Sequence, residues 1–446
     1  MGEWKKVRIG EFLTERQGRY KPDDHAIATY KRLDKIDFSG TAHISEKPSK
    51  TDMIVVQPGD LVISGINVAK GAIAVYQGTE PVTATIHYSS YIFDDSVVDL
   101  EYFKYFVKSP AFIETLKKQV KGGIKTEIKP KVFLPLEISL PDLPTQKQIV
   151  KRISVNLKRV NKLAKEIETQ KRYAKQLRRN ILQDAIEGKL TADWRKDHPV
   201  QKGNPGYDAE ALFELIQKER KVDKKRKALP PILDAEKPFE LPSGWKWVRL
   251  GEICESNLGK MLDGIKNQGI SRKYLRNLNV RWFDFDLSDL LEMKIQDEEL
   301  LRCSVQKGDL LVCEGGYPGR SAIWNENYNI CFQKAIHRVR FYLMSNMPII
   351  FNYYLFYLCE TNQIEKHLTG EGIKHLTGVK LKQMILALSP SQEQVEIVNQ
   401  IKKLLSKVKQ LENKISQREE YTNQLMKSIL KDTLKEDMSY GKTTAN

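Results

Sequence analysis

The sequence of 446 residues contains little cysteine and no long apolar run. Its five cysteines, at positions 254, 303, 313, 331 and 359, all lie in the second half and form no Cys-x-x-Cys pair. This spacing argues against a zinc site and against a disulfide framework, so we expect buried or free thiols in a reducing compartment. The sequence contains no stretch of about 18 apolar residues that could span a bilayer, and it does not open with an apolar signal core. The sequence therefore predicts a cytoplasmic protein without a membrane partner.

Catalytic motifs are also missing. No Gly-x-x-x-x-Gly-Lys-[Ser/Thr] phosphate loop is present for ATP. The nearest match to the loop of a DNA amino-methyltransferase, at 204–207, lacks its second proline and follows no cofactor motif. The histidines form no His-x-x-x-His pattern, and carboxylate-x-Lys triplets such as 127–129 arise by chance when 29% of the residues are charged. We therefore predict a chain without catalysis, without a metal site and without a cofactor of its own.

Negative charge is in deficit. The 73 lysines and arginines exceed the 57 aspartates and glutamates, which gives a formal net charge of +16. A basic protein attracts polyanions at long range and releases counterions when it neutralises phosphates. The composition favours a nucleic-acid partner, with a merely soluble basic protein as the alternative.

The sequence repeats itself. Twelve residues of a helical pattern between Ile149 and Leu182 recur 248 positions later, between Ile397 and Leu430. The tripeptide Gly-Asp-Leu at 59–61 returns at 308–310, and Trp-Lys-x-Val-Arg at 4–8 returns at 245–249. The duplicated unit therefore consists of a globular part followed by a helix.

Each globular part reads as a mixed α and β domain. Short β-type runs with Pro-Gly and Gly turn signals occupy the first part, and a helical pattern follows at 99–120. We predict six segments in all: a first globular domain at 1–148, a helix at 149–190, a linker with a short helix at 191–241, a second globular domain at 242–396, a second helix at 397–438 and a flexible tail at 439–446.

The two long helices carry a heptad pattern. A helix of about 40 residues is a rod of about 60 Å that has no core of its own, so its apolar stripe must pack on another surface. Because two similar units in one chain can imitate a twofold dimer, we predict that the helices pair antiparallel. The alternative is that each helix packs on its own domain. The predicted pairing residues are Ile153, Val160, Ile167, Ile181, Ile401, Val408, Ile415 and Ile429.

Several stretches together resemble a known family. They are LPSGWKWVRLGEI at 241–253, the stretch at 273–293, KGDLLVCEGGYPGRSAIW at 307–324, a glutamine opening each long helix (Gln146 and Gln394), and LQDAIEGKLTADWR at 182–195. In this order, and duplicated, they resemble the specificity subunit of type I restriction-modification enzymes over essentially the whole chain.

The resemblance implies an α+β architecture of two similar target recognition domains, separated by two long antiparallel helices that form a coiled coil. Each domain would read one half of a bipartite sequence in double-stranded DNA. Two methyltransferase (M) subunits and the restriction (R) subunits would be the partners, and they would carry S-adenosylmethionine, ATP and Mg. Two rival functions are a self-contained DNA methyltransferase or nuclease fusion and a coiled-coil scaffold without a DNA role.

Three clusters are candidates for DNA contact. The first is the loop after each Gly-Asp-Leu strand, the second is the shared Gly-Ile-Lys loop before each long helix, and the third is a basic and aromatic run in the second domain. The loop after each Gly-Asp-Leu strand could instead be a tight turn that only joins two strands, and the residues shared by the Gly-Ile-Lys loops could serve phosphate binding or structure. The candidate residues are Ser64, Asn67, Lys70, Tyr317 and Arg320 in the first cluster, Lys125, Thr126, Lys129, Lys374 and His375 in the second, and Arg272, Lys273 and Arg276 in the third.

Overall fold

The structure is a computed structural model, and it forms two compact units that we describe separately. Its described residues are 4–37, 40–66, 72–106, 109–119, 129–220, 228–343 and 345–439, without the side chains at 110, 111, 113, 116, 117 and 430–439. The first unit combines Met1–Thr169 with Ser416–Asn446, and the second is Gln170–Ile415. The two long helices each run through both units.

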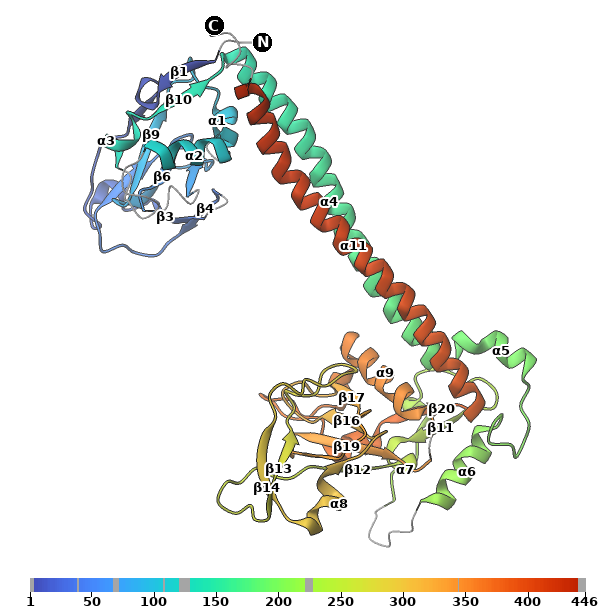
Figure 1. The fold of residues 1–446 in the computed structure, drawn as a ribbon. Coiled ribbons are helices and arrows are strands. Elements are labelled where there is room, and N and C mark those ends of the chain that lie inside the picture. The colour runs from blue at the N-terminus through green and yellow to red at the C-terminus, as the bar shows by residue number, and fades with distance from the viewer. Residues whose placement is uncertain are drawn as a thin grey trace. The chain divides into compact units, whose positions relative to one another are not determined.

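The described residues of the first domain form three sheets, whose strands can be followed in Figure 1. A two-stranded sheet pairs β1 (Lys5–Arg8) with β10 (Glu137–Leu140). One four-stranded sheet has the order β2 (Leu13–Glu15), β9 (Tyr88–Phe93), β6 (Leu61–Ser64), β7 (Ile73–Val75). The other has the order β4 (Ala42–Ser45), β3 (Lys31–Ile36), β8 (Val82–Thr85), β5 (Met53–Val56). Its helices are α1 (Leu100–Phe106), α2 (Pro110–Gln119) and α3 (Pro130–Phe133).

The second domain repeats this plan strand for strand. β11 (Lys246–Arg249) pairs with β20 (Ile385–Leu388). The four-stranded sheets are β12 (Cys254–Leu258), β19 (Ile336–Phe341), β16 (Leu310–Cys313), β17 (Ser321–Ile323) and β14 (Leu291–Ile295), β13 (Ile270–Leu275), β18 (Ile330–Phe332), β15 (Ser304–Val305). Only the β3–β8 and β13–β18 pairs are parallel among the pairs of named strands in the described residues. The helices are α7 (Leu250–Ile253), α8 (Leu300–Cys303), α9 (Met347–Glu360) and α10 (Gly378–Gln383).

Each domain has its own apolar core. In the first domain it combines aliphatic side chains with a group of aromatic rings, and the rings of Phe12 and Phe103 meet edge to face at 5.6 Å. The first turns of the helix that follows contribute Ile149 and Ile153 to the same core. Part of this helix therefore packs on its own domain, as the alternative interpretation of the sequence anticipates.

The long helices are α4 (Leu143–Ile186) and α11 (Ser391–Ser439). Both begin six residues before the predicted starts, at Leu143 rather than Ile149 and at Ser391 rather than Ile397. At α4 the reason is a cap, because the Thr145 N–H donates to the Asp142 carboxylate at 2.9 Å. α4 ends before the predicted residue 190, since Gly188 takes a left-handed conformation (φ 72°) that terminates a helix.

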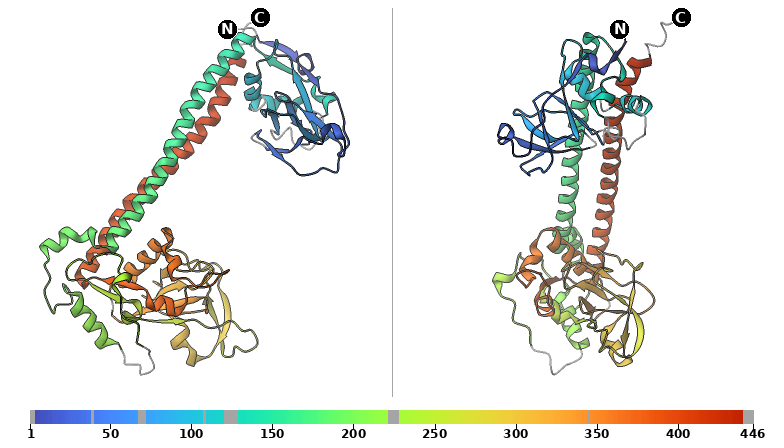
Figure 2. Two further views of the ribbon diagram at one scale, coloured as in Figure 1. Left: turned by 180° about the vertical axis from the view of Figure 1, so that it is seen from behind. Right: turned by 90° about the vertical axis from the view of Figure 1, so that its left-hand side faces the viewer.

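Within the second unit the two helices pack antiparallel (Figure 2). Leu182 and Ala185 of α4 share a buried cluster with Ile397 and Ile401 of α11. Nearer the start of α4, Arg178 forms an ion pair with Glu412 further along α11. Lower numbers in one helix thus lie opposite higher numbers in the other.

The predicted heptad residues are mostly buried. Those that are less than a tenth exposed are Ile153, Val160, Ile167, Ile181, Ile401, Val408 and Ile415. Ile429 is half-buried. Thr422 takes the position that Ala174 holds in the first copy, and its hydroxyl donates to the Arg418 carbonyl at 2.7 Å, so the polar atom in the stripe is satisfied.

The segment between the copies holds α5 (Ala192–Asp197) and α6 (Ala209–Glu219). Asp208 caps α6 by accepting a hydrogen bond from the Glu210 N–H at 3.0 Å. Ala209, Leu212 and Ile216 then join the core of the second domain. The expected linker helix is therefore an integral part of that domain's packing.

Candidate nucleic-acid interface

A glycine-rich loop at 314–320 joins β16 to β17. Gly316 has a left-handed backbone (φ 75°), and a Cβ added there would lie 2.5 Å from Nδ2 of Asn277. Asn277 itself donates from Nδ2 to the Gly315 carbonyl oxygen at 3.2 Å. Only glycine allows this approach, so the loop and the turn after β13 are locked together.

Arg320 and Tyr317 divide two tasks in this loop. Arg320 is only 9% exposed, and its Nη2 donates to the Asn277 carbonyl oxygen at 2.7 Å. Its guanidinium lies 4.1 Å from the centre of the Tyr317 ring, while Tyr317 is 57% exposed. A cation under an aromatic face holds the ring in place. The burial favours Arg320 as a support and Tyr317 as the residue that faces solvent.

The loop at 369–376 lies beside the glycine-rich loop. Thr369 and His375 exchange two backbone hydrogen bonds of 2.9 Å, and the Leu376 N–H donates to the Glu314 carbonyl at 2.8 Å. A Cβ added at Gly315 would lie 2.9 Å from Nδ1 of His375. Two of the clusters predicted from the sequence are thus brought into one site by the fold.

The charges around this site are mixed. Lys374 is exposed and forms an ion pair of 3.8 Å with Glu365. Burial raises the pKa of the Glu314 carboxyl, and electrostatic interactions with His375 and Lys334 partly offset this increase. The Glu314 side chain gives the site carboxyl oxygens that can accept hydrogen bonds, and Tyr317 and Asn277 add neutral hydrogen-bonding groups. Such groups suit the readout of base edges.

The third predicted cluster is engaged with carboxylates. Arg272 pairs with Asp297 at 2.6 Å, and Arg276 pairs with Asp289 at 2.6 Å. Lys273 is exposed on the same strand. In this structure both guanidinium groups are therefore neutralised within the domain.

In the first domain the predicted residues Asn67, Lys70, Lys125 and Thr126 lie outside the described residues. Ser64, at the end of β6, is 6% exposed, and its N–H donates to the Ala72 carbonyl at 3.0 Å. Lys129 directly precedes α3. Sequence reasoning missed Asn277, although it lies in the stretch at 273–293 that carries part of the family resemblance.

The stretches at 182–195 and 241–253 meet at a buried carboxylate. Glu393, near the start of α11, is 1% exposed. It accepts hydrogen bonds from the Thr191 hydroxyl at 2.6 Å and from Nε1 of Trp245 at 2.7 Å, and it pairs with Arg195. Three donors compensate the buried charge. These motif residues therefore fix the end of α4, the start of α11 and the entry to the second domain.

Comparison with known proteins settles the family. The family model for the type I restriction modification DNA specificity domain matches residues 1–171 and again residues 242–420. The chain belongs to this family. The two matches coincide with the two copies seen in the sequence and in the sheets.

Curated relatives agree with this family. The chain is 35% identical over 136 residues to the specificity subunit of the type I restriction enzyme EcoAI of Escherichia coli, which covers 30% of this chain and 23% of that protein. It is 22% identical over 335 residues to the EcoKI specificity subunit of Escherichia coli K12, which covers 74% of this chain and 63% of that protein. The matches span less than two thirds of the length of these relatives.

Solved structures share the fold. The chain resembles the HsdS subunit from Thermoanaerobacter tengcongensis with a TM-score of 0.52 at 17% identity, covering 96% of this chain and 95% of the other. It also resembles a chain from a structure described as the basis of complex assembly and conformational transition of the type I R-M system, with a TM-score of 0.61 at 18% identity and 96% coverage of both chains. The predicted fold class and the resemblance to type I specificity subunits are therefore confirmed.

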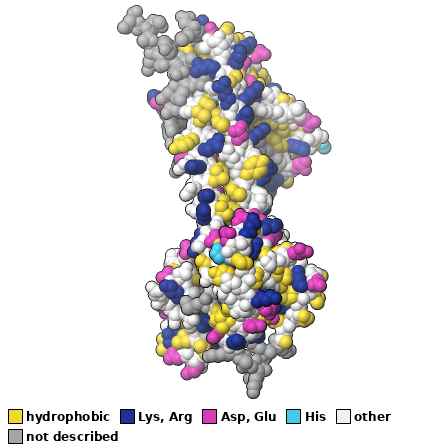
Figure 3. All heavy atoms as spheres, turned by 90° about the vertical axis from the view of Figure 1, so that its right-hand side faces the viewer, with side chains coloured by type: hydrophobic (Ala, Val, Ile, Leu, Met, Phe, Trp, Pro, Cys, Tyr) yellow, Lys and Arg dark blue, Asp and Glu magenta, His cyan; other side chains and the backbone are white. Residues whose placement is uncertain are grey.

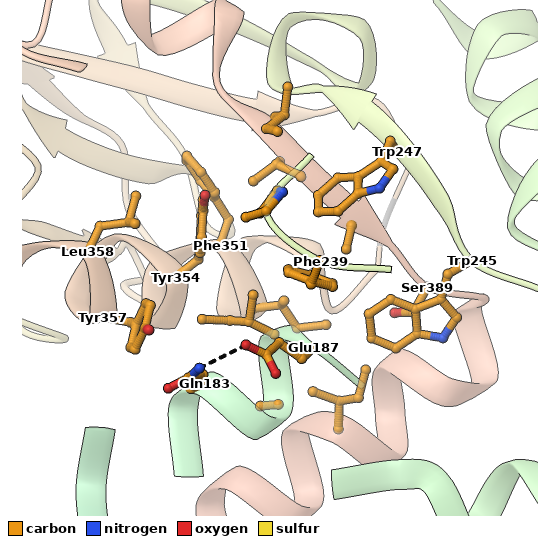
Figure 4. A pocket seen from close by; sticks show the side chains of 18 of the residues that line it. Gln183, Glu187, Phe239, Trp245, Trp247, Phe351, Tyr354, Tyr357, Leu358 and Ser389 are labelled. Atoms are coloured by element: carbon orange, nitrogen blue, oxygen red, sulfur yellow. Dashed lines mark hydrogen bonds between the residues drawn. The ribbon is translucent and has the colours of Figure 1, made fainter. Parts of the chain in front are cut away.

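The second specificity domain also contains an aromatic cavity of about 210 Å³ (Figure 4). It lies between α4, α9, β11 and β20, and Trp245, Trp247 and Tyr354 form part of its wall. At its edge the Glu187 carboxylate accepts a hydrogen bond from Nε2 of Gln183 at 2.8 Å. Residues at the end of α4 and residues of the domain line this cavity together. The two tryptophans of the 241–253 stretch therefore serve packing between α4 and the domain.

The thiols of the second specificity domain are poor nucleophiles. Burial raises the pKa of the Cys313 and Cys331 thiols to about 11 and that of Cys359 to about 12. Over the part of the chain that the structure describes, no group of three or more His, Cys, Asp or Glu residues is placed to hold a metal ion. Over the same residues, no helix has the length and apolar character needed to cross a membrane.

Proposed function

We propose that the chain is the DNA-binding specificity subunit of a type I restriction-modification enzyme, and that it reads a bipartite target with one recognition domain per half-site. The observation that carries this proposal is the double match of the specificity family to two domains with the same sheet order. The net charge of +16 supports a polyanionic partner. S-adenosylmethionine, ATP and Mg would belong to the partner subunits, and the complex would work in the cytoplasm.

In the second domain we propose that Tyr317, Asn277 and His375 face the bases, with Arg320 as their support. Base edges in the major groove are distinguished by side chains that donate and accept hydrogen bonds in fixed positions. The support of Arg320 under Tyr317 and the lock between Gly315 and Asn277 provide such fixed positions. The equivalent loops of the first domain, with Asn67, Lys70, Lys125 and Thr126, would read the other half-site.

Methylome sequencing tests this assignment. The chain and its methyltransferase partner are expressed in a host without other methylation, and the methylated motif is compared between wild type and Tyr317→Ala. We expect the variant to relax or lose one half of the motif and to keep the other half. Tyr328→Ala is the control, because Tyr328 is 50% exposed in the same domain but belongs to another loop. An unchanged motif, or equal loss of both halves, would contradict the assignment.

We further propose that two methyltransferase subunits dock on the long helices, and that they direct the restriction subunits to the same site. Tyr173 and Leu177 on α4 are 63% and 45% exposed, and their counterparts Tyr421 and Leu425 on α11 are 67% and 44% exposed. A spacing of four residues places each pair on one helix face. Exposed hydrophobic groups also lie among charged ones on the face in Figure 3. Repeated exposed apolar pairs favour two copies of the same partner.

Native mass spectrometry of the co-expressed complex tests the stoichiometry. We expect Tyr173→Asp or Tyr421→Asp alone to leave one methyltransferase subunit per chain, and both together to leave none. Val155→Asp is the matched control, because Val155 is 43% exposed on α4 but its counterpart in the second copy is Lys403. If the control removes a subunit equally well, or the double variant keeps two, the docking proposal is wrong.

A further inference from the structure

In the second domain a helix covers a surface that no helix covers among the described residues of the first domain. α6 runs along β11 and α7 (Figure 1). The Ala209 N–H donates to the Gly244 carbonyl at 2.9 Å, and Nε2 of Gln217 donates to the Glu252 carbonyl at 3.0 Å. These bonds fix both ends of the helix on the domain.

Charge and apolar contacts hold the middle of α6. Glu210 in its first turn pairs with Lys246 of β11 at 2.7 Å, and Nζ of Lys246 lies 5.2 Å from the centre of the Phe213 ring. Leu212 and Ile216 are 4% and 5% exposed and belong to the same core cluster as Val248. An acidic first turn and an apolar stripe are thus the features that this surface selects.

The described residues of the first domain include the same two strands but no helix at this place. Lys5 and Val7 of β1 correspond to Lys246 and Val248, and Lys5 pairs with Leu140 as Lys246 pairs with Leu388. Val7 is only half-buried and Lys5 is exposed.

A hollow of about 410 Å³ lies at this place in the first domain, lined by Lys5, Val7, Ser96, Val97 and residues 140–143.

We propose that this hollow binds an amphipathic helix of a partner polypeptide that resembles α6, with an apolar stripe against Val7 and Leu140 and a carboxylate in its first turn for Lys5. The direction of the helix follows from the second domain. There the Ser391 N–H donates to the Pro205 carbonyl at 3.0 Å, just before α6 begins.

In the first domain, the segment that corresponds to the one before Ser391 ends in Asp142. The positive N-terminal end of a docked helix would therefore lie near a carboxylate, which stabilises it. This proposal does not depend on DNA reading, since it rests on the comparison of two domain surfaces.

The probe is a fluorescent peptide of residues 205–220, and its binding to the full chain is followed by anisotropy. We expect saturable binding that Lys5→Glu weakens about fivefold to tenfold, because an attraction becomes a repulsion. Val7→Asp should abolish it. Lys6→Glu is the matched control, since successive residues of a strand point to opposite faces. A peptide carrying Glu210→Lys should recover binding to the Lys5→Glu chain.

Three results would overturn the proposal. They are no binding of the peptide to the wild-type chain, equal weakening by Lys5→Glu and Lys6→Glu, or no recovery by the charge-swapped peptide. Analytical ultracentrifugation adds a fourth arm. A self-association of the chain that Lys5→Glu abolishes would assign the hollow to a second copy and would reject the partner helix.

Discussion

At the scale of single residues, the two copies solve one problem with different partners. Asp60 and Asp309 follow the repeated glycine and are 3% and 1% exposed. Each accepts a backbone hydrogen bond from three residues earlier, at 2.9 Å and 2.8 Å. The compensating guanidinium comes from Arg16, just after β2, in one copy, and from Arg340, within β19, in the other. A buried carboxylate needs a cation, but two different strands can supply it.

His337 is a residue whose burial has a consequence for pH dependence. It is 1% exposed and lies in β19, and its Nε2 donates a hydrogen bond to the Leu376 carbonyl oxygen at 2.7 Å. Burial lowers its pKa from 6.5 to about 4. The unfolded chain therefore binds a proton between these two pH values while the folded chain does not.

We expect stability to fall as the pH drops from 6.5 to about 4, by up to about 3 kcal/mol from this residue. Above pH 6.5 both states are neutral at this position and the contribution is constant. His337→Gln keeps a donor for Leu376 and removes the titration. Urea unfolding at several pH values should give a smaller acid loss for this variant than for the wild type. Equal acid losses would show that His337 does not carry the effect.

At the scale of elements, the sequence predicted the helices and domains that a repeated pattern indicates. It missed the contacts that depend on the surface against which an element packs. The heptad spacing and the duplication predicted two long helices and two mixed domains. The sequence predicted a short helix within the linker at 191–241, but it did not predict that this helix joins the core of the second domain. A stripe of Leu212 and Ile216 indicates a buried face without naming the surface that buries it.

In the candidate site, too, the sequence predicted the parts but not the contacts between them. The loops at 314–320 and 369–376 were predicted separately, from glycines and from shared Gly-Ile-Lys residues. Their meeting through Leu376 and Glu314 depends on sheet topology, which no local pattern contains. The support of Tyr317 by Arg320 also escaped prediction, because a terminal cation in a loop reads as an exposed charge.

The junction at the end of α4 gives a test at this scale. Gly188 is left-handed (φ 72°), and a Cβ there would lie 2.7 Å from Cγ of Pro242 and 3.0 Å from the Trp245 ring. Gly203 is also left-handed (φ 82°) but has no atom within 4 Å of an added Cβ. It therefore isolates the cost of the backbone conformation alone.

We expect Gly203→Ala to destabilise the second unit by about 1 kcal/mol and Gly188→Ala by about 2 to 4 kcal/mol, because the clash adds to the backbone cost. Tryptophan fluorescence during urea unfolding measures both. Similar losses for the two variants would mean that the tight contact around Gly188 relaxes without cost.

At the scale of the whole molecule, the copies agree where they make the same local contact. Gln146 and Gln394 are both fully buried near the start of the long helices, and Nε2 of each donates to the carbonyl five residues earlier, at 2.8 Å and 2.9 Å. The loops that we propose for DNA contact differ between the copies, as Thr126 and His375 illustrate. Similarity therefore follows shared structure, and divergence follows the proposed reading of different half-sites.

The length of the helices gives the last prediction, which rests on the proposed function. We expect the number of unspecified base pairs between the half-sites to depend on the length of α4 and α11. Deleting 161–167 and 409–415 together removes one heptad from each helix, so that Val160 and Val408 stay in phase with Ala174 and Thr422. The helices become shorter by about 10 Å, which corresponds to about 3 base pairs of DNA.

Methylome sequencing of the double deletion should therefore return the same two half-sites with a spacer that is shorter by about 3 base pairs. Deleting 161–167 alone is the control, because it leaves the antiparallel helices one heptad out of register at one end and should reduce methylation at every spacing. A double deletion that methylates the original spacer with undiminished efficiency would separate helix length from target geometry. The spacer would then have to be set by contacts of the recognition domains themselves.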